Sequence, residues 1–289
     1  MAPMLIVLAI VAAWPLGRTI LFSLTDARLS DFGEAAFVGL ANYLERDDGV
    51  WFGVLADPLF WTATRNTLLF AVISVSLETV LGVAIALLLH QSFPGRGLVR
   101  AAVLVPWAIP TVVSAKMWAW MLHDQFGIVN DLLLRLGLVA APVAWLAEPD
   151  LALWSVIAVD VWKTTPFVAL LVLAALQMLP RDCYEAARVD GVHPVRVFFE
   201  VTLPLIRPAL IVAVVFRLLD AMRVFDIVYV MTGTAEATMT LSVYARQQMF
   251  EFQDVAYGST AATLLFATIA FAVAILLMAA RGRVLGEMR

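Results

Sequence analysis

The sequence is poor in residues on which many functions depend. Its 289 residues include one cysteine, Cys183, three histidines and only two lysines. A single cysteine excludes an internal disulfide framework and a cysteine-based metal site. The formal net charge of −4 and the lack of a basic face argue against nucleic-acid binding. We find no glycine-rich phosphate loop, no Ser-His-Asp set and no metal-binding helix motif, so we expect a non-catalytic chain that does not itself hold ATP.

Charged residues are also scarce, and long apolar runs take their place. Hydrophobic residues make up 63% of the chain and charged residues 15%, against about a half and about a quarter in soluble domains. This composition predicts an all-α integral membrane protein. The length accommodates one transmembrane domain, 1–289, with six spans of about 20 residues each. The apolar runs place these spans at about 3–24, 66–89, 101–122, 151–178, 205–231 and 259–280.

The distribution of basic residues predicts the orientation in the membrane. The loops at 90–100 and 180–208, together with the C-terminal end, hold nine Lys and Arg residues. The loops at 26–63, 123–150 and 232–258 hold four. Because cytoplasmic loops carry the excess of Lys and Arg, we expect both termini and the 180–208 segment on the cytoplasmic side.

The charge-rich segment 180–208 lies between two long apolar runs. Pro180 and Gly191 bound a first short helix, and Pro194 begins a second helix that ends near Leu203. The residue pattern alone leaves two interpretations open. The segment is either a solvated loop that joins two spans, or a hairpin that plugs into a soluble partner at the membrane surface.

A motif in this hairpin, 180–204, resembles a family signature. Glu-Ala-Ala at 185–187 is followed after three residues by Gly191, and after nine more by Val-Thr-Leu-Pro at 201–204. This spacing resembles the EAA loop of ABC-importer permeases, with Val201 where Ile is usual. The resemblance implies that the hairpin is a coupling helix that docks on a cytoplasmic ATPase. The residues that it implies in coupling are Glu185, Ala186, Ala187, Asp190, Gly191 and Phe198.

A second motif follows the first predicted span. The run Phe-Val-Gly-Leu-Ala-Asn-Tyr at 37–43 resembles a signature of sugar permeases, and Asp190 and Phe198 are typical of the same branch. Gly39 permits a turn, and Asn42 can cap a helix at the outer surface. The resemblance covers nearly the whole chain and is strongest to the maltose-type carbohydrate-uptake branch, which includes trehalose importers.

The resemblance implies a type I ABC-importer permease fold and import of a di- or oligosaccharide such as trehalose or maltose. Transport is expected to proceed by alternating access, driven by a separate ATPase through the EAA loop. The implied partners are a second homologous permease subunit, two ATPase subunits and an extracytoplasmic sugar-binding protein. No cofactor is expected in this chain, since ATP and Mg belong to the ATPase subunits. The implied location is the bacterial cytoplasmic membrane, which the chain crosses several times.

Ionisable residues inside the apolar runs are costly and suggest function. In the fourth and fifth predicted spans they are Asp160, Lys163, Arg217, Asp220, Arg223 and Asp226. Spacings of three place Asp220 beside Arg217 and Arg223 on a helix. These charges form either a structural ladder of ion pairs or a polar cavity for a hydrophilic solute. Pro166 is expected to break the fourth span, and Glu78, in the second span, to pair with a Ser or Thr of a neighbouring helix.

A sugar needs hydrogen-bond partners for its hydroxyls and an apolar face for its ring. Alignment on the EAA loop places family sugar contacts at several of these charged positions, and also at Ala221 and Val224, which cannot form side-chain hydrogen bonds. Phe167 and Tyr229 are candidates for stacking. The expected substrate-binding residues are Asp160, Lys163, Thr164, Phe167, Arg217, Asp220, Arg223, Asp226 and Tyr229.

A second hypothesis is an ion- or proton-coupled secondary transporter that uses Asp160, Asp220 or Asp226 as an ion site. This hypothesis leaves the hairpin without a role, and no inverted repeat is visible in the sequence. A membrane enzyme is a third hypothesis, for which the sequence offers no catalytic constellation.

Overall fold

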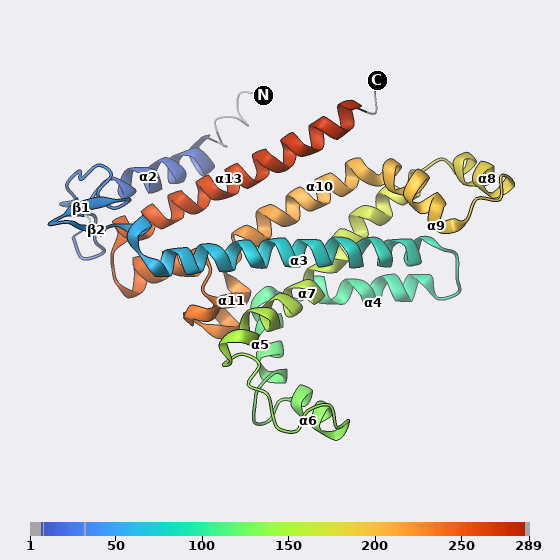
Figure 1. Ribbon diagram of the computed structural model, residues 1–289, viewed down its shortest axis with the longest axis horizontal. Helices are drawn as coiled ribbons and strands as arrows, with labels where there is room; N and C mark the ends of the chain where they lie inside the picture. Colours follow the sequence, from blue (N-terminus) through green and yellow to red (C-terminus); the bar gives the residue numbers. More distant parts are fainter. Residues whose placement is uncertain (1–6, 8, 32, 287–289) are drawn as a thin grey trace.

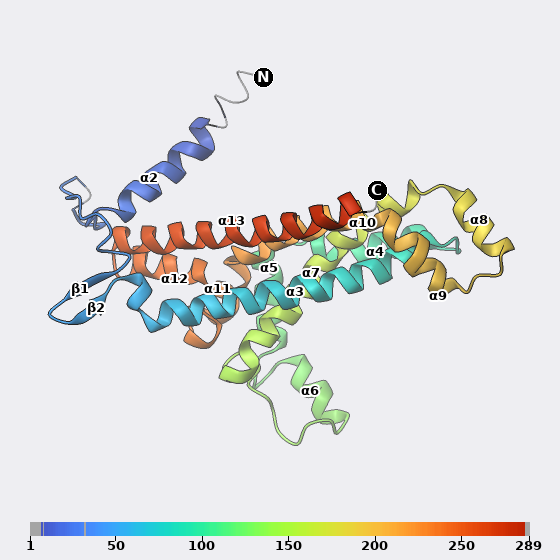
Figure 2. The ribbon, with the colours of Figure 1, turned by 45° about the horizontal axis from the view of Figure 1, so that its top comes forward.

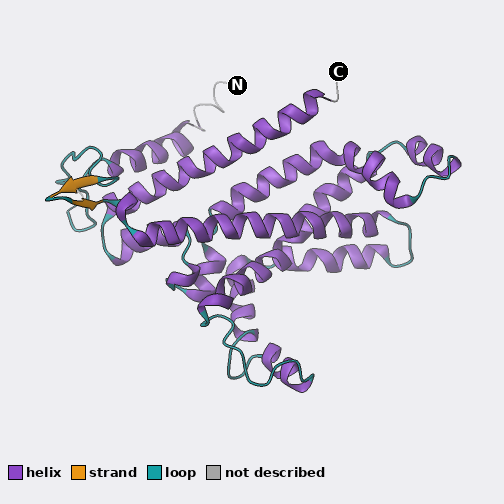
Figure 3. Cartoon of the chain, in the orientation of Figure 1, coloured by secondary structure: helices purple, strands orange, loops and turns teal. Residues whose placement is uncertain are grey.

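The computed structural model describes residues 7, 9–31 and 33–286 of the chain. Within these residues nearly all secondary structure is helical, and the strands form one short hairpin (Figure 3). This composition confirms the predicted all-α class, because apolar runs that satisfy their backbone hydrogen bonds internally become helices. The division into a single domain stays a prediction.

Four long helices form the body of the molecule (Figures 1 and 2): α3 (Pro58–His90), α7 (Pro149–Gln177), α10 (Leu203–Met222) and α13 (Val255–Gly286). Helix α3 packs most extensively on α7, and α10 packs against both. Helix α4 (Arg96–Ala108) also packs on α7 and makes a smaller contact with α3. The apolar core lies between α3 and α7, so any polar residue on their facing sides is buried.

The structure supports four or five of the six predicted spans. Four segments are long and apolar enough to cross a membrane, and they are Pro58–His90, Pro149–Gln177, Pro194–Met222 and Val255–Met278. Helix α4 and α5 (Thr111–Met121) make a fifth if the bent pair is one span. The first predicted span corresponds to a shorter apolar helix, Ala9–Ser23, and its expected start at 3–6, together with residue 8, lies outside the described residues.

The predicted span at 101–122 is not one continuous helix. Helices α4 and α5 meet at a bend of 92°. Ile109, which precedes Pro110, is extended with φ −74° and ψ 132°. A residue before proline disfavours the helical region, so the chain stops at Ile109 and restarts after Pro110. Pro106 lies inside α4, so the break is at Pro110 and not at this earlier proline.

Two further boundaries differ from the prediction. Helix α7 continues through Pro166, which was expected to break it, because packing of α7 on α3, α4 and α10 outweighs the roughly 3 kcal/mol cost of an interior proline. The predicted span at 205–231 stops early, because α10 ends at Met222 and α11 (Asp226–Thr232) begins after a short irregular stretch. This second break opens space inside the bundle.

The loop at 123–150, which was predicted to lie outside, carries α6 (Ile128–Arg135) and projects from the side of the bundle (Figure 1). One end of the molecule carries the elements of the other two segments that were predicted to lie outside, 26–63 and 232–258 (Figure 1). These are the strands β1 (Glu45–Asp47) and β2 (Val50–Phe52), the short helices η2 (Val54–Ala56), η4 (Glu236–Thr238) and α12 (Leu241–Arg246), and the π-helix η5 (Gln247–Glu251). Gly39 makes the expected turn with φ +63°. Asn42, expected to cap the start of a helix, instead donates to the carbonyls of Ser23 and Thr25 and so holds the end of α2 (Trp14–Ser23), which follows the π-helix η1 (Ala9–Ala13).

The opposite end carries the predicted hairpin. It comprises α8 (Arg181–Val189), α9 (Pro194–Val197) and the π-helix η3 (Phe198–Thr202), which runs directly into α10. Gly191 has φ +65° and forms the bend between the two short helices. The N–H of Val192 donates to the carbonyl of Ala187, which completes the end of α8. The bend confirms the expected hairpin. The second helix of the hairpin is not a separate element, because it continues through η3 into α10.

Gly82 is predicted to be required for the contact between α3 and α7. A β-carbon at Gly82 lies 2.7 Å from Cγ1 of Val168, a β-branched residue of α7 that has little rotamer freedom. Replacement with alanine, Gly82→Ala, is expected to lower stability by about 1–3 kcal/mol. The matched control is Gly97→Ala in α4, where a β-carbon meets nothing within 4 Å. Melting temperatures of the purified variants in detergent test the difference, and a Gly82→Ala protein at least as stable as the control contradicts it.

Candidate functional site

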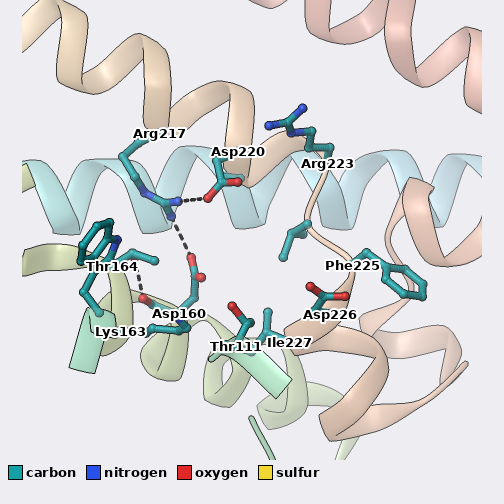
Figure 4. Close-up of a pocket in the computed structure, with 13 residues that line it drawn as sticks. Thr111, Asp160, Lys163, Thr164, Arg217, Asp220, Arg223, Phe225, Asp226 and Ile227 are labelled. Carbon is teal, nitrogen blue, oxygen red and sulfur yellow. Dashed lines mark hydrogen bonds and ion pairs between the residues drawn. The ribbon is translucent and has the colours of Figure 1, made fainter. Parts of the chain in front are cut away.

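A polar cavity lies inside the apolar bundle where two helix breaks face each other. It has a volume of about 340 Å³ and is bounded by α7, by the break between α10 and α11, and by Trp107 and Thr111 on either side of the α4–α5 bend (Figure 4). Continuous helices leave no such space, so the two breaks create the cavity. Six ionisable side chains line it: Asp160, Lys163, Arg217, Asp220, Arg223 and Asp226.

Arg217 is the centre of the charged cluster. Its Nε and Nη2 donate to the two carboxylate oxygens of Glu78, at 2.5 and 2.8 Å. Its Nη2 also donates to Oδ2 of Asp160 at 3.0 Å, and its Nη1 to Oδ2 of Asp220 at 2.6 Å. The residue is 3% exposed. These four bonds use four of the five guanidinium N–H groups. Arg217 therefore organises the carboxylates and has little capacity left to bind a solute.

Glu78 is fully buried at the back of this cluster, in the middle of α3. Oγ1 of Thr164 lies 2.6 Å from Oε1 of Glu78 and 2.6 Å from the carbonyl oxygen of Asp160, so one hydroxyl proton serves two acceptors. The predicted pairing of Glu78 with a Ser or Thr is confirmed. Its main partner, Arg217, was missed, because 139 residues separate the two and no local spacing links them.

The cluster explains how so much charge is tolerated between apolar helices. Burying an unpaired ion costs several kcal/mol, whereas paired and hydrogen-bonded ions offset much of that cost. Lys163 is largely buried at the cavity wall and, within the described part of the chain, makes no hydrogen bond or ion pair. The wall therefore presents one free ammonium donor and carboxylate acceptors to whatever occupies the cavity.

One pair of the predicted ladder of ion pairs along the fifth span is confirmed. Asp220 pairs with Arg217, three residues away, as the spacing predicted. Across the described residues, Arg223 forms no ion pair with Asp220 or Asp226, and both Arg223 and Asp226 are exposed at the cavity rim. The reason is the end of α10 at Met222, which removes helical geometry from the last part of the ladder.

Aromatic side chains flank the cavity on one side. Trp107 stacks on Phe167 with ring centroids 6.2 Å apart, and both line an adjoining pocket of about 230 Å³ that shares Thr164 and Arg217 with the first. The sequence pattern did not single out Trp107, although Pro110, three residues later, marks the helix break. Tyr229, in contrast, is not in the wall of either pocket. It stacks on Phe225, and the guanidinium of Arg246 lies 4.3 Å from its ring centroid.

The predicted coupling residues lie at the far end of the bundle from this cavity (Figure 1). Glu185, Ala186, Asp190 and Gly191 are exposed. Phe198 is half-buried and packs against the core between α3 and α10, and it borders a pocket of about 690 Å³ beneath the hairpin. The tip is thus accessible to another protein, while its base is anchored in the bundle. Among the described residues no cluster of three or more metal-ligating side chains is present.

Comparison with known families identifies the fold. Residues 78–285 match the family of binding-protein-dependent transport system inner membrane components. The chain belongs to this family. The permease therefore is a membrane protein whose matched region includes the charged cluster, the cavity and the hairpin.

Individual relatives agree with this assignment. The trehalose/maltose transport system permease protein MalF of Thermococcus litoralis is 44% identical over 82% of this chain and 77% of its own length. The trehalose transport system permease protein SugA of Mycobacterium tuberculosis is 38% identical, over 93% and 83%. The sulfoquinovosyl glycerol transport system permease protein SmoG of Agrobacterium fabrum is also 38% identical, over 92% and 84%.

A solved structure confirms the fold. A chain of a bacterial ABC transporter that imports the acidic polysaccharide alginate superposes with a TM-score of 0.79 over 96% of the permease and 92% of that chain, at 22% identity. The likeness confirms the predicted type I ABC-importer permease fold, although the described residues account for four or five rather than six spans.

Loss of Arg217 is predicted to be far more damaging than loss of Arg223. In Arg217→Met the buried carboxylates of Glu78 and Asp160 keep no cationic partner within hydrogen-bond reach among the described residues, and removing one partner of a buried ion pair costs about 3–5 kcal/mol. The control Arg223→Met removes an exposed side chain that forms no ion pair in the described part of the chain. The melting temperature and the yield of folded protein in detergent measure the stability of the two variants. Equal losses in Arg217→Met and Arg223→Met contradict a stabilising role for the Arg217 cluster.

Proposed function

We propose that this permease is the membrane subunit of an ATP-driven importer for a di- or oligosaccharide such as trehalose or maltose. The observation that carries the proposal is the polar cavity of about 340 Å³ inside an otherwise apolar bundle. The names of the trehalose/maltose and trehalose permeases among its relatives support a sugar as the solute.

The chemistry of the cavity suits a polyhydroxylated solute. Carboxylates of Asp160 and Asp220 accept hydrogen bonds from hydroxyl groups, and the ammonium of Lys163 donates them. The stacked rings of Trp107 and Phe167 give an apolar face beside the polar wall. A sugar ring has both kinds of surface, so the two walls complement it.

We propose three kinds of partner for this chain. They are a second permease subunit, two ATPase subunits that hold ATP and Mg, and an extracytoplasmic sugar-binding protein. The exposed hairpin tip supports docking of an ATPase, and the excess of basic residues in the loops at its end supports a cytoplasmic location for that end and for both termini. The bacterial cytoplasmic membrane is the expected site.

One continuous helical segment links the hairpin to the cavity. From Pro194 the chain runs through α9, η3 and α10 to Met222, a helical segment of 29 residues. Its first part forms the hairpin, and its last turns carry Arg217 and Asp220 into the cavity. A helix transmits an axial displacement with little loss, so ATP-driven movement of a docked ATPase reaches the cavity wall through α10.

The alternative is a secondary transporter that uses Asp160, Asp220 or Asp226 as an ion site. Purified permease alone and the full assembly with ATPase and binding protein can be reconstituted in vesicles with labelled trehalose or maltose. The importer proposal expects uptake only by the full assembly with ATP, insensitive to a protonophore. Uptake by the permease alone that collapses with the protonophore supports the alternative.

Gly191 is predicted to couple ATP hydrolysis to uptake. Its φ of +65° disfavours any side chain, above all a β-branched one, so Gly191→Val changes the bend at the docking tip. We expect the variant to reach the membrane and the assembly to hydrolyse ATP, with sugar uptake lost. The matched control, Gly137→Val, has the same φ of +65° in a loop distant from the hairpin. Normal uptake by Gly191→Val, or the same loss in the control, contradicts the prediction.

A further inference from the structure

Glu78 serves the cavity without lining it. Its side chain is fully buried behind Arg217, and the cavity wall does not include it. It nevertheless makes more contacts to the cluster than any wall residue except Arg217, since its two oxygens accept from Nε and Nη2 of Arg217 and one of them also contacts Thr164. A buried carboxylate in the middle of a span is costly, so these contacts offset a considerable penalty.

The contact between Glu78 and Arg217 is two-pronged, which fixes the plane of the guanidinium. With Nε and one N–H of Nη2 held by Glu78, the other N–H groups point at Asp160 and Asp220, as the dashed lines in Figure 4 show. The carboxylates of Asp160 and Asp220 are wall residues. Their placement therefore depends on an arginine whose own orientation is set from a third helix.

We propose that Glu78 is a positioning residue for sugar binding, acting through Arg217 on the carboxylates of Asp160 and Asp220. The inference rests on the proposed sugar-import function. Helix α3 contributes no wall residue of this cavity. In this proposal, α3 nevertheless orients the polar groups that α7 and α10 present to the sugar. Removing a group that orients a binding residue commonly changes affinity by about 10–100-fold, as is seen for the residues that hydrogen-bond to the ligands of metal sites.

The test is the isosteric substitution Glu78→Gln. The amide keeps one acceptor oxygen but loses the charge and turns an NH₂ group toward the guanidinium. Arg217 then depends more heavily on Asp160 and Asp220, whose oxygens become less available to hydroxyl groups. We expect the dissociation constant for labelled trehalose or maltose to rise about tenfold, which corresponds to about 1.4 kcal/mol. Equilibrium dialysis of the purified permease–ATPase assembly, without binding protein, measures it, and the maximal ATP hydrolysis rate should be unchanged.

Two further proteins separate positioning from folding. Ser74→Ala is the matched control, because Ser74 lies one turn before Glu78 on α3, is fully buried, and its hydroxyl has no partner in the described part of the chain. The double variant Glu78→Gln/Arg217→Gln removes both charges of the Glu78–Arg217 pair, so only Asp160 is left buried without its cation, and we expect a smaller loss of stability than in Arg217→Met. We expect Ser74→Ala to bind sugar normally, and the double variant to assemble yet still bind sugar weakly.

The outcomes distinguish a positioning role of Glu78 from a purely structural one. Weaker sugar binding by correctly assembled Glu78→Gln, with normal binding by Ser74→Ala, supports positioning. A Glu78→Gln protein that assembles poorly but binds sugar normally once assembled overturns the inference, as does a double variant with normal affinity. A wild-type assembly that binds and imports neither sugar contradicts the proposed function itself, and this inference falls with it.

Discussion

The guanidinium of Arg217 joins three helices from distant parts of the sequence. It reaches Glu78 on α3 and Asp160 on α7 from its own position on α10, and it also binds Asp220 one turn further along α10. Three carboxylates share one buried cation, so each helix is held in register with the other two. Apolar packing of α3 on α7 has no preferred direction, so it does not by itself fix one register. The charge-assisted hydrogen bonds of this cluster require a particular geometry and therefore do. The arrangement of the cavity wall depends on it.

The cavity itself is a product of helix termination. Bends at Ile109–Pro110 and at Arg223–Phe225 leave a gap that side chains of continuous helices would fill. Irregular backbone inside a membrane is tolerated where it lines a polar cavity, and the carbonyl of Val224 is satisfied by the hydroxyl of Thr240. The polar cavity therefore exists because the backbone is irregular at these two places.

Much of the architecture was predictable from the sequence, because it is local. The apolar runs predicted α3, α7 and α13 within several residues, and Gly191 with its neighbours predicted the bent hairpin. Motif spacing predicted the family. Helix breaks were less predictable, since α10 ends at Met222 without a proline or glycine to mark the place, and α7 passes through Pro166 because tertiary packing overrides the local cost.

The residues of the candidate site also differ in how far the sequence could predict them. Asp160, Lys163 and Arg217 were identifiable because charges inside apolar runs are conspicuous, and the pairing of Arg217 with Asp220 follows from helical spacing. The pairing with Glu78 depends on the packing of α10 against α3, which no pattern within either helix specifies. Trp107 lines the cavity only because the chain turns by 92° just after it, and Tyr229 points elsewhere because α11 begins a new direction.

The spans differ greatly in how much of their surface the chain itself covers. The apolar window of α7 is 67% buried within the chain, whereas that of Val255–Met278 is 6% buried. The first part of α13 is buried, with Ala256 and Ala261 in the apolar core, but exchanges among apolar side chains at 266–278 mainly alter contacts outside the chain and change its own packing little. We therefore expect the exposed part of α13 to accept more substitutions than α7. Substitutions on α13 are limited mainly by what surrounds the chain, and substitutions on α7 by the packing of the fold itself.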